Sequence, residues 1–444
     1  MFPLTRPVRQ TLATFILVGL TVVPTALVAT YAWRINQPGH VRDVEIELGR
    51  QLGLQVTLEA VRYPRPGEVV YQGIVLRQEE PRGKGLVEIA RADLARLERA
   101  DRELTLHLEN PRLCTESPRN GLAQLGVLLQ RSGQIPFERI NLSAPSCQLD
   151  LGHEGLQFAL REVAGEFVVD PKAPGLKIAY RVPGAGAGTR CELTLTRDRR
   201  TEQIETSLVF KTVEGMPLAA RVLNVFFDAD DWLGTEAKVE GSVSLRQAGS
   251  HDWEALFQGE LLDVDLAKLV GRRFPRHRLT GRARVAIKRA QWGQRPTQGP
   301  GWVDVQGGLS AGQGSIGVNL IEALAREMKF RRSARLANLD ARKTEVDFRA
   351  LGLSFAMQSS GEIEIAGALG TEFAPEAVIA GGTSTLLSAP LGIASVHGLI
   401  KTLFPISQAS SGILVPHTAE SQVLLSLPVP ASTVTTNRQT VDGN

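Results

Sequence analysis

The residues that could support acid–base or metal chemistry are scattered along this 444-residue chain rather than grouped. A zinc peptidase site needs two histidines at HExxH spacing, and a general base needs a partner that orients it. Neither pattern occurs among the histidines, which are His40, His107, His153, His251, His277, His397 and His417. The acidic segment FDADDWLG lacks the glycine that a calcium loop has at its sixth position, and it lacks the distal glutamate of such a loop. We therefore expect no catalytic residue, no metal site and no cofactor, and we do not expect an enzyme.

The glycine-rich segments do not fit nucleotide binding. PGAGAG at 183–188 lies between two expected strands, whereas a phosphate-binding loop opens onto a helix N-terminus. AGQGSIG at 311–317 lacks the spacing of a GxSxG nucleophile elbow. The charge is nearly balanced, with 50 basic and 47 acidic residues giving +3. Because nucleic-acid binding needs a concentrated basic surface, we expect no nucleic-acid partner.

The three cysteines, Cys114, Cys147 and Cys191, match no zinc-ligand spacing. Cys114 and Cys147 each follow a strand and a proline-containing break, so neighbouring strands would bring them into disulfide range. The favoured interpretation is that all three are small buried hydrophobic residues. The Cys114–Cys147 disulfide is the alternative.

The first 35 residues predict a membrane anchor. Residues 11–32 carry no charge and would form about 33 Å of helix, against a hydrocarbon core of about 30 Å. Pro24 is tolerated in such helices, and Tyr31 and Trp33 stand where the far interface should lie. The arginines at positions 6 and 9 favour a cytoplasmic N-terminus. We predict a single transmembrane helix over residues 11–33, and a cleaved signal peptide is the alternative.

The clearest pattern in the rest of the sequence is a set of aliphatic residues at alternating positions. Residues 52–58 and 104–108 alternate aliphatic and polar side chains, which is the period of a strand with one apolar face. Similar segments recur every 8 to 14 residues or so between Gly, Pro, Asn and Asp turns, which indicates hairpins. We predict a mostly β fold in which the transmembrane helix precedes a long, curled antiparallel sheet with a few short helices.

The apolar faces of so many strands need a cover. The expected helices are few, and aromatic residues make up only 5% of the chain, so a tight aromatic core is disfavoured. An open groove would leave the apolar face for a lipid acyl chain, and burying a sixteen-carbon chain would gain roughly 12 kcal/mol. The residues expected to line this groove are Leu54, Val56, Leu58, Ile74, Leu76, Leu104, Leu106 and Leu108. The alternative is an ordinary core that faces a second sheet.

Both ends of the chain resemble the AsmA-like proteins. The anchor is followed by a short helix and by LGLQVTLEAVRYPRPGEVVYQGIVLR, which resembles the chorein-like start of that family. GWVDVQGGLSAGQGSIGVNLIEALAREMKF and then TEVDFRALGLSFAMQSSGEIEIAGALG, with Asp347-Phe348, resemble its closing segment. The resemblance covers roughly residues 10–110 and 300–410. It implies inner-membrane anchoring, an extended β-groove, and a role in lipid or outer-membrane homeostasis.

On this resemblance the chain divides into a cytoplasmic segment (1–10), the transmembrane helix (11–33), a chorein-like β segment (34–118), a central β-groove with helices (119–300), an AsmA-like β segment (301–428) and a disordered tail (429–444). The expected function is non-enzymatic handling of phospholipid, from the inner membrane and with the bulk of the chain in the periplasm. The expected partners are membrane phospholipids, with an outer-membrane or envelope protein as a further candidate. The alternative function is a membrane-anchored scaffold for envelope proteins, whose sheet edges would receive partner strands.

Overall fold

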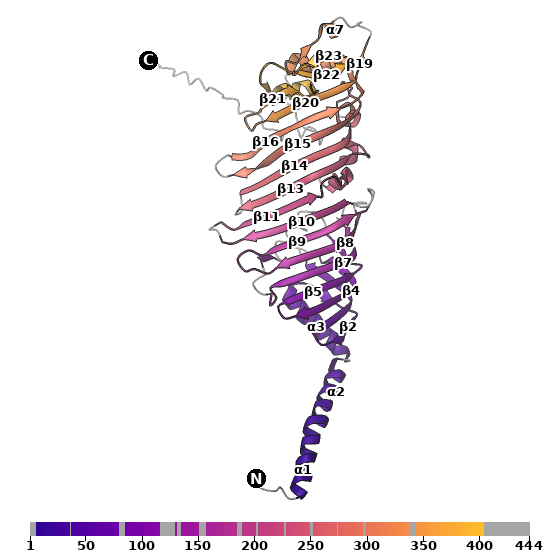
Figure 1. The fold of residues 1–444 in the computed structure, drawn as a ribbon, viewed down its shortest axis with the longest axis vertical. Helices are drawn as coiled ribbons and strands as arrows, with labels where there is room; N and C mark the ends of the chain where they lie inside the picture. Colours follow the sequence, from indigo (N-terminus) through magenta and orange to yellow (C-terminus); the bar gives the residue numbers. More distant parts are fainter. Residues whose placement is uncertain are drawn as a thin grey trace, which may run out of the picture.

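The computed structural model describes residues 6–35, 37–79, 85–115, 129–130, 135–150, 157–183, 189–200, 203–225, 228–248, 252–272, 274–295, 299–337 and 343–403. In it, an N-terminal helix leads into one elongated, curled sheet (Figure 1). The sheet ends in a small cluster of short strands and helices at the far end from the N-terminal helix.

The N-terminal helix is continuous through α1 (Arg6–Leu17), the π-helical turn η1 (Val18–Val22) and α2 (Val23–Ile35). Its stretch Ala13–Ile35 has a mean hydropathy of 2.0 and is long and apolar enough to cross a membrane. Pro24 explains the π turn, because its ring cannot accommodate the carbonyl four residues earlier. The neighbouring Val23 N–H bonds instead to the carbonyl of Val18, five residues back.

Threonine hydroxyls in this helix are satisfied within the helix itself. Thr14, Thr25 and Thr30 each donate to the carbonyl four residues earlier, at 2.9, 2.6 and 2.7 Å, and Thr21 does the same. Internal bonding of this kind is what a hydrocarbon environment demands of a hydroxyl group.

The second helix, α3 (Pro38–Leu52), connects the apolar helix to the sheet. It has Pro38 at its first turn and ends at Gly53, whose φ of 68° is the left-handed conformation that glycine adopts without cost. Glu45 accepts a hydrogen bond from the Leu58 amide at 2.7 Å, and His40 lies 2.8 Å from the Tyr63 hydroxyl. These contacts fix the helix to the first strands.

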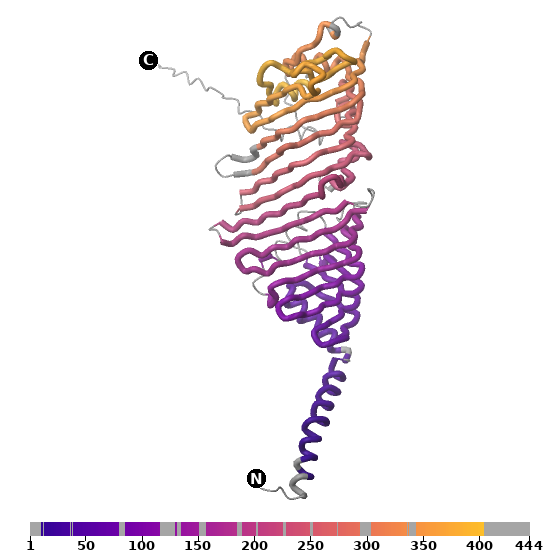
Figure 2. The backbone as a smooth tube through the Cα atoms, viewed as in Figure 1, coloured from indigo at the N-terminus to yellow at the C-terminus, as the bar shows by residue number. Residues whose placement is uncertain are grey.

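The main sheet has 22 strands, and a separate two-stranded sheet pairs β17 with β19. Most strands pair with their neighbours along the chain, so the sheet grows steadily away from the N-terminal helix (Figure 2). Strand bounds in the first half are β1 Gln55–Thr57, β2 Ala60–Arg65, β3 Glu68–Glu79, β4 Leu86–Ala100, β5 Glu103–Glu109, β6 Arg112–Cys114, β7 Arg139–Asp150, β8 Gln157–Val168, β9 Gly175–Val182, β10 Thr189–Asp198, β11 Glu205–Thr212 and β12 Leu218–Ala219. Those in the second half are β13 Lys238–Ala248, β14 Asp252–Asp265, β15 Arg282–Arg295, β16 Gly299–Ala311, β17 Gly314–Gly317, β18 Arg331–Arg332, β19 Glu345–Phe348, β20 Ala350–Met357, β21 Glu362–Gly367, β22 Ala377–Gly381, β23 Ser384–Ser388 and β24 Ala394–Ser395.

The sheet departs from the predicted antiparallel arrangement at one place. β7 runs parallel to both β5 and β6, which makes the sheet mixed. A parallel neighbour requires a crossover of a dozen or more residues, and residues 115–138 provide that length. The predicted mostly β, curled sheet behind an apolar N-terminal helix is confirmed, with this parallel exception.

The short helices gather at the C-terminal part of the molecule. The largest buried cluster packs α6 (Val318–Glu327), α8 (Val396–Leu403), α5 (Ala229–Leu233) and the π-helical turn η4 (Ala267–Arg272) against β20, β22 and β23. Two further short helices are the 3-10 turn η3 (Ala220–Val225) and α7 (Ala334–Ala337). A single helix over 217–234, which the apolar periodicity favours, does not form: β12, η3 and α5 share that stretch.

Candidate functional site

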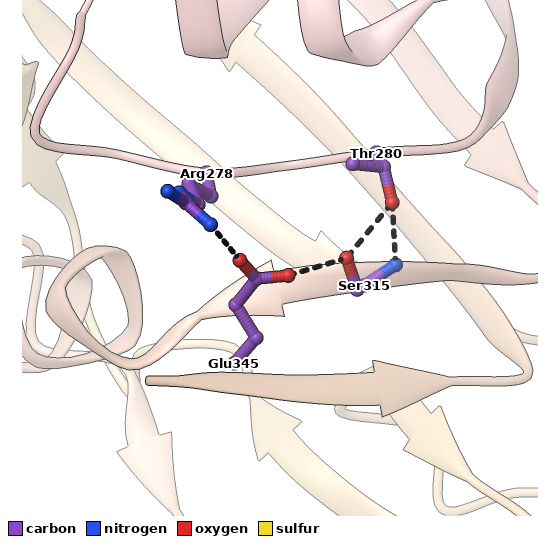
Figure 3. Close-up of polar contacts among 4 residues, drawn as sticks. All are labelled: Arg278, Thr280, Ser315 and Glu345. Carbon is purple, nitrogen blue, oxygen red and sulfur yellow. Dashed lines mark hydrogen bonds and ion pairs between the residues drawn. The ribbon is translucent and has the colours of Figure 1, made fainter. Parts of the chain in front are cut away.

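A polar cluster of four side chains joins Arg278, Thr280, Ser315 and Glu345 (Figure 3). Arg278 donates to one Glu345 oxygen, and the Ser315 hydroxyl donates to the other at 3.2 Å. Thr280 lies 2.9 Å from the Ser315 hydroxyl and accepts from its amide. Together they attach β17 and β19 to the segment before β15, which makes an isolated bridge from Leu279 to Ile316.

This cluster does not have the chemistry of a nucleophilic site. The Arg278 hydrogen bond, and secondarily the Ser315 one, hold the pKa of Glu345 below its usual value, so the carboxylate stays ionised. A carboxylate bound to a guanidinium is a poor general base, and Ser315 has no histidine contact here to take its proton. The arrangement is that of a structural clamp.

The histidines and acids of the described residues form no group of three or more that could hold a metal ion. His107 is exposed on β5, bonded to the Ser143 hydroxyl, as its polar position in the alternation predicts. His277 is buried, and its Nε2 atom lies 2.7 Å from the Thr402 carbonyl of α8. The contacts of both histidine rings therefore join one element of the fold to another.

The candidate disulfide between Cys114 and Cys147 is absent, because all three cysteines are free thiols. Cys114 lies opposite Asp150, three residues beyond Cys147 along β7. That offset is about 10 Å and turns the two side chains to opposite faces, beyond the reach of a disulfide. Burial raises the pKa of Cys147 to about 11, which leaves it an unreactive packed thiol.

The predicted lining residues fall into two groups. Near α3, Val56 pairs with Leu76 and Ile74 pairs with Ala92, while Val56 and Leu58 are buried. Leu54 is half-buried just before β1. The strand registers continue this group from Leu76 through Ala90 of β4, Leu113 of β6 and Leu149 of β7, along a line of residues distinct from the one that contains Leu106.

The second group consists of Leu104, Leu106 and Leu108, and it lies at the start of a much longer apolar surface. Leu106 of β5 lies opposite Leu97 of β4 and Leu142 of β7, and each following register places another apolar residue or glycine opposite the last. We call this line of side chains the central row. Its members are Leu97, Leu106, Leu142, Gly165, Ile178, Leu193, Phe210, Val243, Phe257, Ala290, Val305, Met357 and Ile363.

Side chains directly opposite each other in a ladder point to the same face, so the central row is one continuous apolar line across the sheet. At about 4.8 Å per strand it is roughly 58 Å long. Every member from Leu97 to Met357 is half-buried rather than covered. The row is therefore an accessible apolar surface and not the inside of a closed core.

A second row runs beside it and begins at Leu104. Its members are Leu104, Ile140, Phe167, Leu176, Leu195, Leu208, Leu245, Ala255, Trp292 and Val303. This row is covered in places, since Leu195 and Ala255 are fully buried, and open in others. Leu108 packs on the same face against Ala144, Cys147 and Val163.

The opposite face of the sheet is polar and carries cross-strand ion pairs. Glu192 of β10 lies between Lys211 of β11 at 3.1 Å and Lys177 of β9 at 3.7 Å, and these lysines hold its pKa below the usual range. Further pairs join Arg139 to Glu166 at 3.2 Å, Arg246 to Glu205 at 2.6 Å, and Arg284 to Glu260 through two hydrogen bonds. One face is thus suited to water and the other to apolar groups.

Alternation in the sequence predicts Leu104, Leu106 and Leu108, but it does not show that the row through Leu106 continues to β21 or that a second row continues from Leu104. The signal was present as alternation within each strand. What the sequence did not supply was the register that aligns one strand's apolar positions with the next. No family model, no curated protein and no solved structure matches the chain.

Proposed function

We propose that this chain is a membrane-anchored, non-enzymatic protein that holds phospholipid acyl chains along the central row. The observation that carries the proposal is the unbroken, half-buried apolar row from β4 to β20, on a sheet whose other face carries ion pairs. Each methylene removed from water is worth about 0.8 kcal/mol, so an aliphatic surface of this length can bind a chain without any catalytic group.

The proposal also places the chain in the membrane by its N-terminal helix. The Ala13–Ile35 helix would be the anchor, and Tyr31 and Trp33, which are 59% and 67% exposed, would lie at its interface with the headgroups. The bulk of the chain would project into the periplasm from the inner membrane, in the manner of AsmA-like proteins. The domain division predicted from the sequence belongs to the same proposal.

The N-terminal edge of the sheet does not favour the scaffold alternative. β2 is at the N-terminal edge, and Pro64 removes one of its backbone donors while Arg62 and Arg65 place charges along it. Proline and charged residues on an edge are devices that prevent strand addition. Addition of a partner strand at this edge is therefore disfavoured.

The test uses adjacent residues on one strand. In the full-length chain in its membrane, Phe210 and Val209 are replaced one at a time by the photo-crosslinker p-benzoylphenylalanine. Both positions are half-buried on β11, but Phe210 belongs to the central row and Val209 lies on the polar face, opposite Thr194 and Ser244. We expect a phospholipid adduct from position 210 and little from position 209.

Equal labelling at the two positions would mean non-specific contact with lipid, and no adduct at position 210 would contradict the proposal. A protein adduct at 210 in place of a lipid would favour the scaffold. A second control, Phe210→Leu, keeps an apolar side chain at this position and should retain lipids that co-purify with the chain. Phe210→Asp should lose them.

A further inference from the structure

The apolar face carries a cation, Arg197, whose contacts among the described residues do not neutralise its charge. Arg197 follows Leu193 and Leu195 on β10 at two-residue spacing, so it lies on their face, at the end of the strand. The residue is half-buried. Its Nη1 atom donates to the Thr206 hydroxyl at 3.1 Å, but its Nε atom is buried and has no hydrogen-bond partner within the described residues.

Neighbouring charges increase this imbalance. Burial lowers the pKa of Arg197, and the nearby cation Arg199 lowers it further. Arg199 is held by the carbonyls of Pro171 and Leu129, at 3.0 and 2.7 Å, so it stays beside Arg197. The nearby acids are occupied by Arg200: Asp170 pairs with its guanidinium at 3.5 Å, and Asp198 accepts from its amide at 2.8 Å.

Two arginines on the polar face have carboxylate partners: Arg246 pairs with Glu205, and Arg284 pairs with Glu260. No described carboxylate pairs with Arg197 in this way. A desolvated guanidinium without an anion is costly, and an anion at this position would remove the cost.

The strand registers extend this position into a polar rim along the edge of the apolar face. Arg197 is opposite Thr206, Thr206 is opposite Gln247, and Gln247 is opposite Trp253. All four side chains can donate hydrogen bonds and none is acidic. The rim runs directly beside the stretch Leu195, Leu208 and Leu245 of the second row, and the nearby Trp253 and Trp292 are 38% and 36% exposed.

We propose that the rim formed by Arg197, Thr206, Gln247 and Trp253 binds the phosphate of a phospholipid whose acyl chains lie over the adjacent apolar rows. A guanidinium binds phosphate oxygens with paired donors, and tryptophan favours the boundary between headgroup and acyl chain. At the other end of the same strands, the same face presents Cys191, Thr212 and Gly241, which carry no charge. The headgroup would therefore take one orientation across the sheet. This inference rests on the proposed function and specifies its ligand.

The experiment places p-benzoylphenylalanine at Leu208, next to the rim, in the full-length chain. The chain is reconstituted in vesicles of phosphatidylglycerol that contain a minor fraction of diacylglycerol with the same acyl chains. The measured quantity is the ratio of phosphatidylglycerol to diacylglycerol adducts by mass spectrometry. We expect Arg197→Met to lower this ratio about tenfold, as loss of a charge-assisted hydrogen bond would, and Arg197→Lys to lower it less.

The matched control is Arg190→Met, which removes an exposed cation from the opposite face of the same strand. It should leave the ratio unchanged. An unchanged ratio in Arg197→Met, with adducts still forming and the protease resistance of the sheet intact, would overturn the headgroup site. Because an apolar residue replaces an unpaired cation, we expect that variant to fold.

Two further outcomes separate the sources of failure. If no lipid adduct forms at Leu208 in any variant, the proposed function itself is wrong at this position. If millimolar inorganic phosphate removes the preference for phosphatidylglycerol, the rim is a site for free phosphate and the lipid assignment is overturned. Retention of the preference in phosphate supports a headgroup site.

Discussion

His277 shows how a single buried side chain can control the attachment of a whole helix. The residue is 2% exposed, its Nε2 atom lies 2.7 Å from the Thr402 carbonyl oxygen of α8, and its Nδ1 atom is buried without a partner in the described residues. Burial lowers the pKa of His277, with Arg276 acting in the same direction and the Thr402 hydrogen bond opposing it. The neutral ring is therefore the form that the fold selects.

The sign of the pH effect follows from that shift. Near pH 6.5 and below, an unfolded or detached His277 binds a proton that the packed ring does not, so packing of α8 weakens as the pH falls through this range. We expect hydrogen exchange in Val396–Leu403, corrected for intrinsic rates, to accelerate between pH 7.5 and 5.5. His277→Gln, which can still donate to Thr402, should show no such change. If the wild type exchanged equally at both pH values, this account of His277 would fail.

At the scale of elements, the glycine pair between β13 and β14 governs how closely two strands approach. Gly241 and Gly259 lie opposite each other, and a Cβ atom on Gly241 would sit 2.2 Å from the Gln258 carbonyl oxygen. Gly241 also has a φ of 142°, which side-chain-bearing residues rarely adopt. Substitution at this position therefore forces the strands apart.

We expect Gly241→Ala to reduce the local stability of this hairpin by about 3 kcal/mol, through overpacking and backbone strain. Protection of β13 and β14 amides from hydrogen exchange should fall roughly a hundredfold. Gly312→Ala is the control, because nothing lies within 4 Å of its Cβ position and its φ is ordinary. Equal protection in the two variants would show that the strands can separate freely at this point.

The elements also show what the sequence could and could not predict. Alternation indicates most strands, but Pro145 looks like a break in the sequence, whereas β7 continues on both sides of it. The apolar stretch at 217–234 has helical spacing, yet its first residues pair with β13 instead. Pairing partners and registers depend on distant segments, so the parallel β5–β7 pair and the length of the central row were beyond local pattern reading.

For the whole molecule, the question is whether the central row holds lipid at separate places or conducts it from one end to the other. The row begins near the N-terminal helix and ends beside the C-terminal cluster, and Val243 lies in its middle, between Phe210 and Phe257. A carboxylate at Val243 would interrupt the apolar line, because an acyl chain passing it must desolvate a charge at a cost of several kcal/mol.

We therefore expect Val243→Asp to separate the two ends. With p-benzoylphenylalanine at Leu106 or at Met357, labelled phospholipid supplied from the anchoring membrane should reach both positions in the otherwise native chain. In Val243→Asp, labelling at Leu106 should persist and labelling at Met357 should fall at least tenfold. Ser244→Asp places the same charge on the polar face of the same strand and should change neither. Undiminished labelling of Met357 in Val243→Asp would mean that lipid reaches the far end by another route, and that the row stores lipid without conducting it.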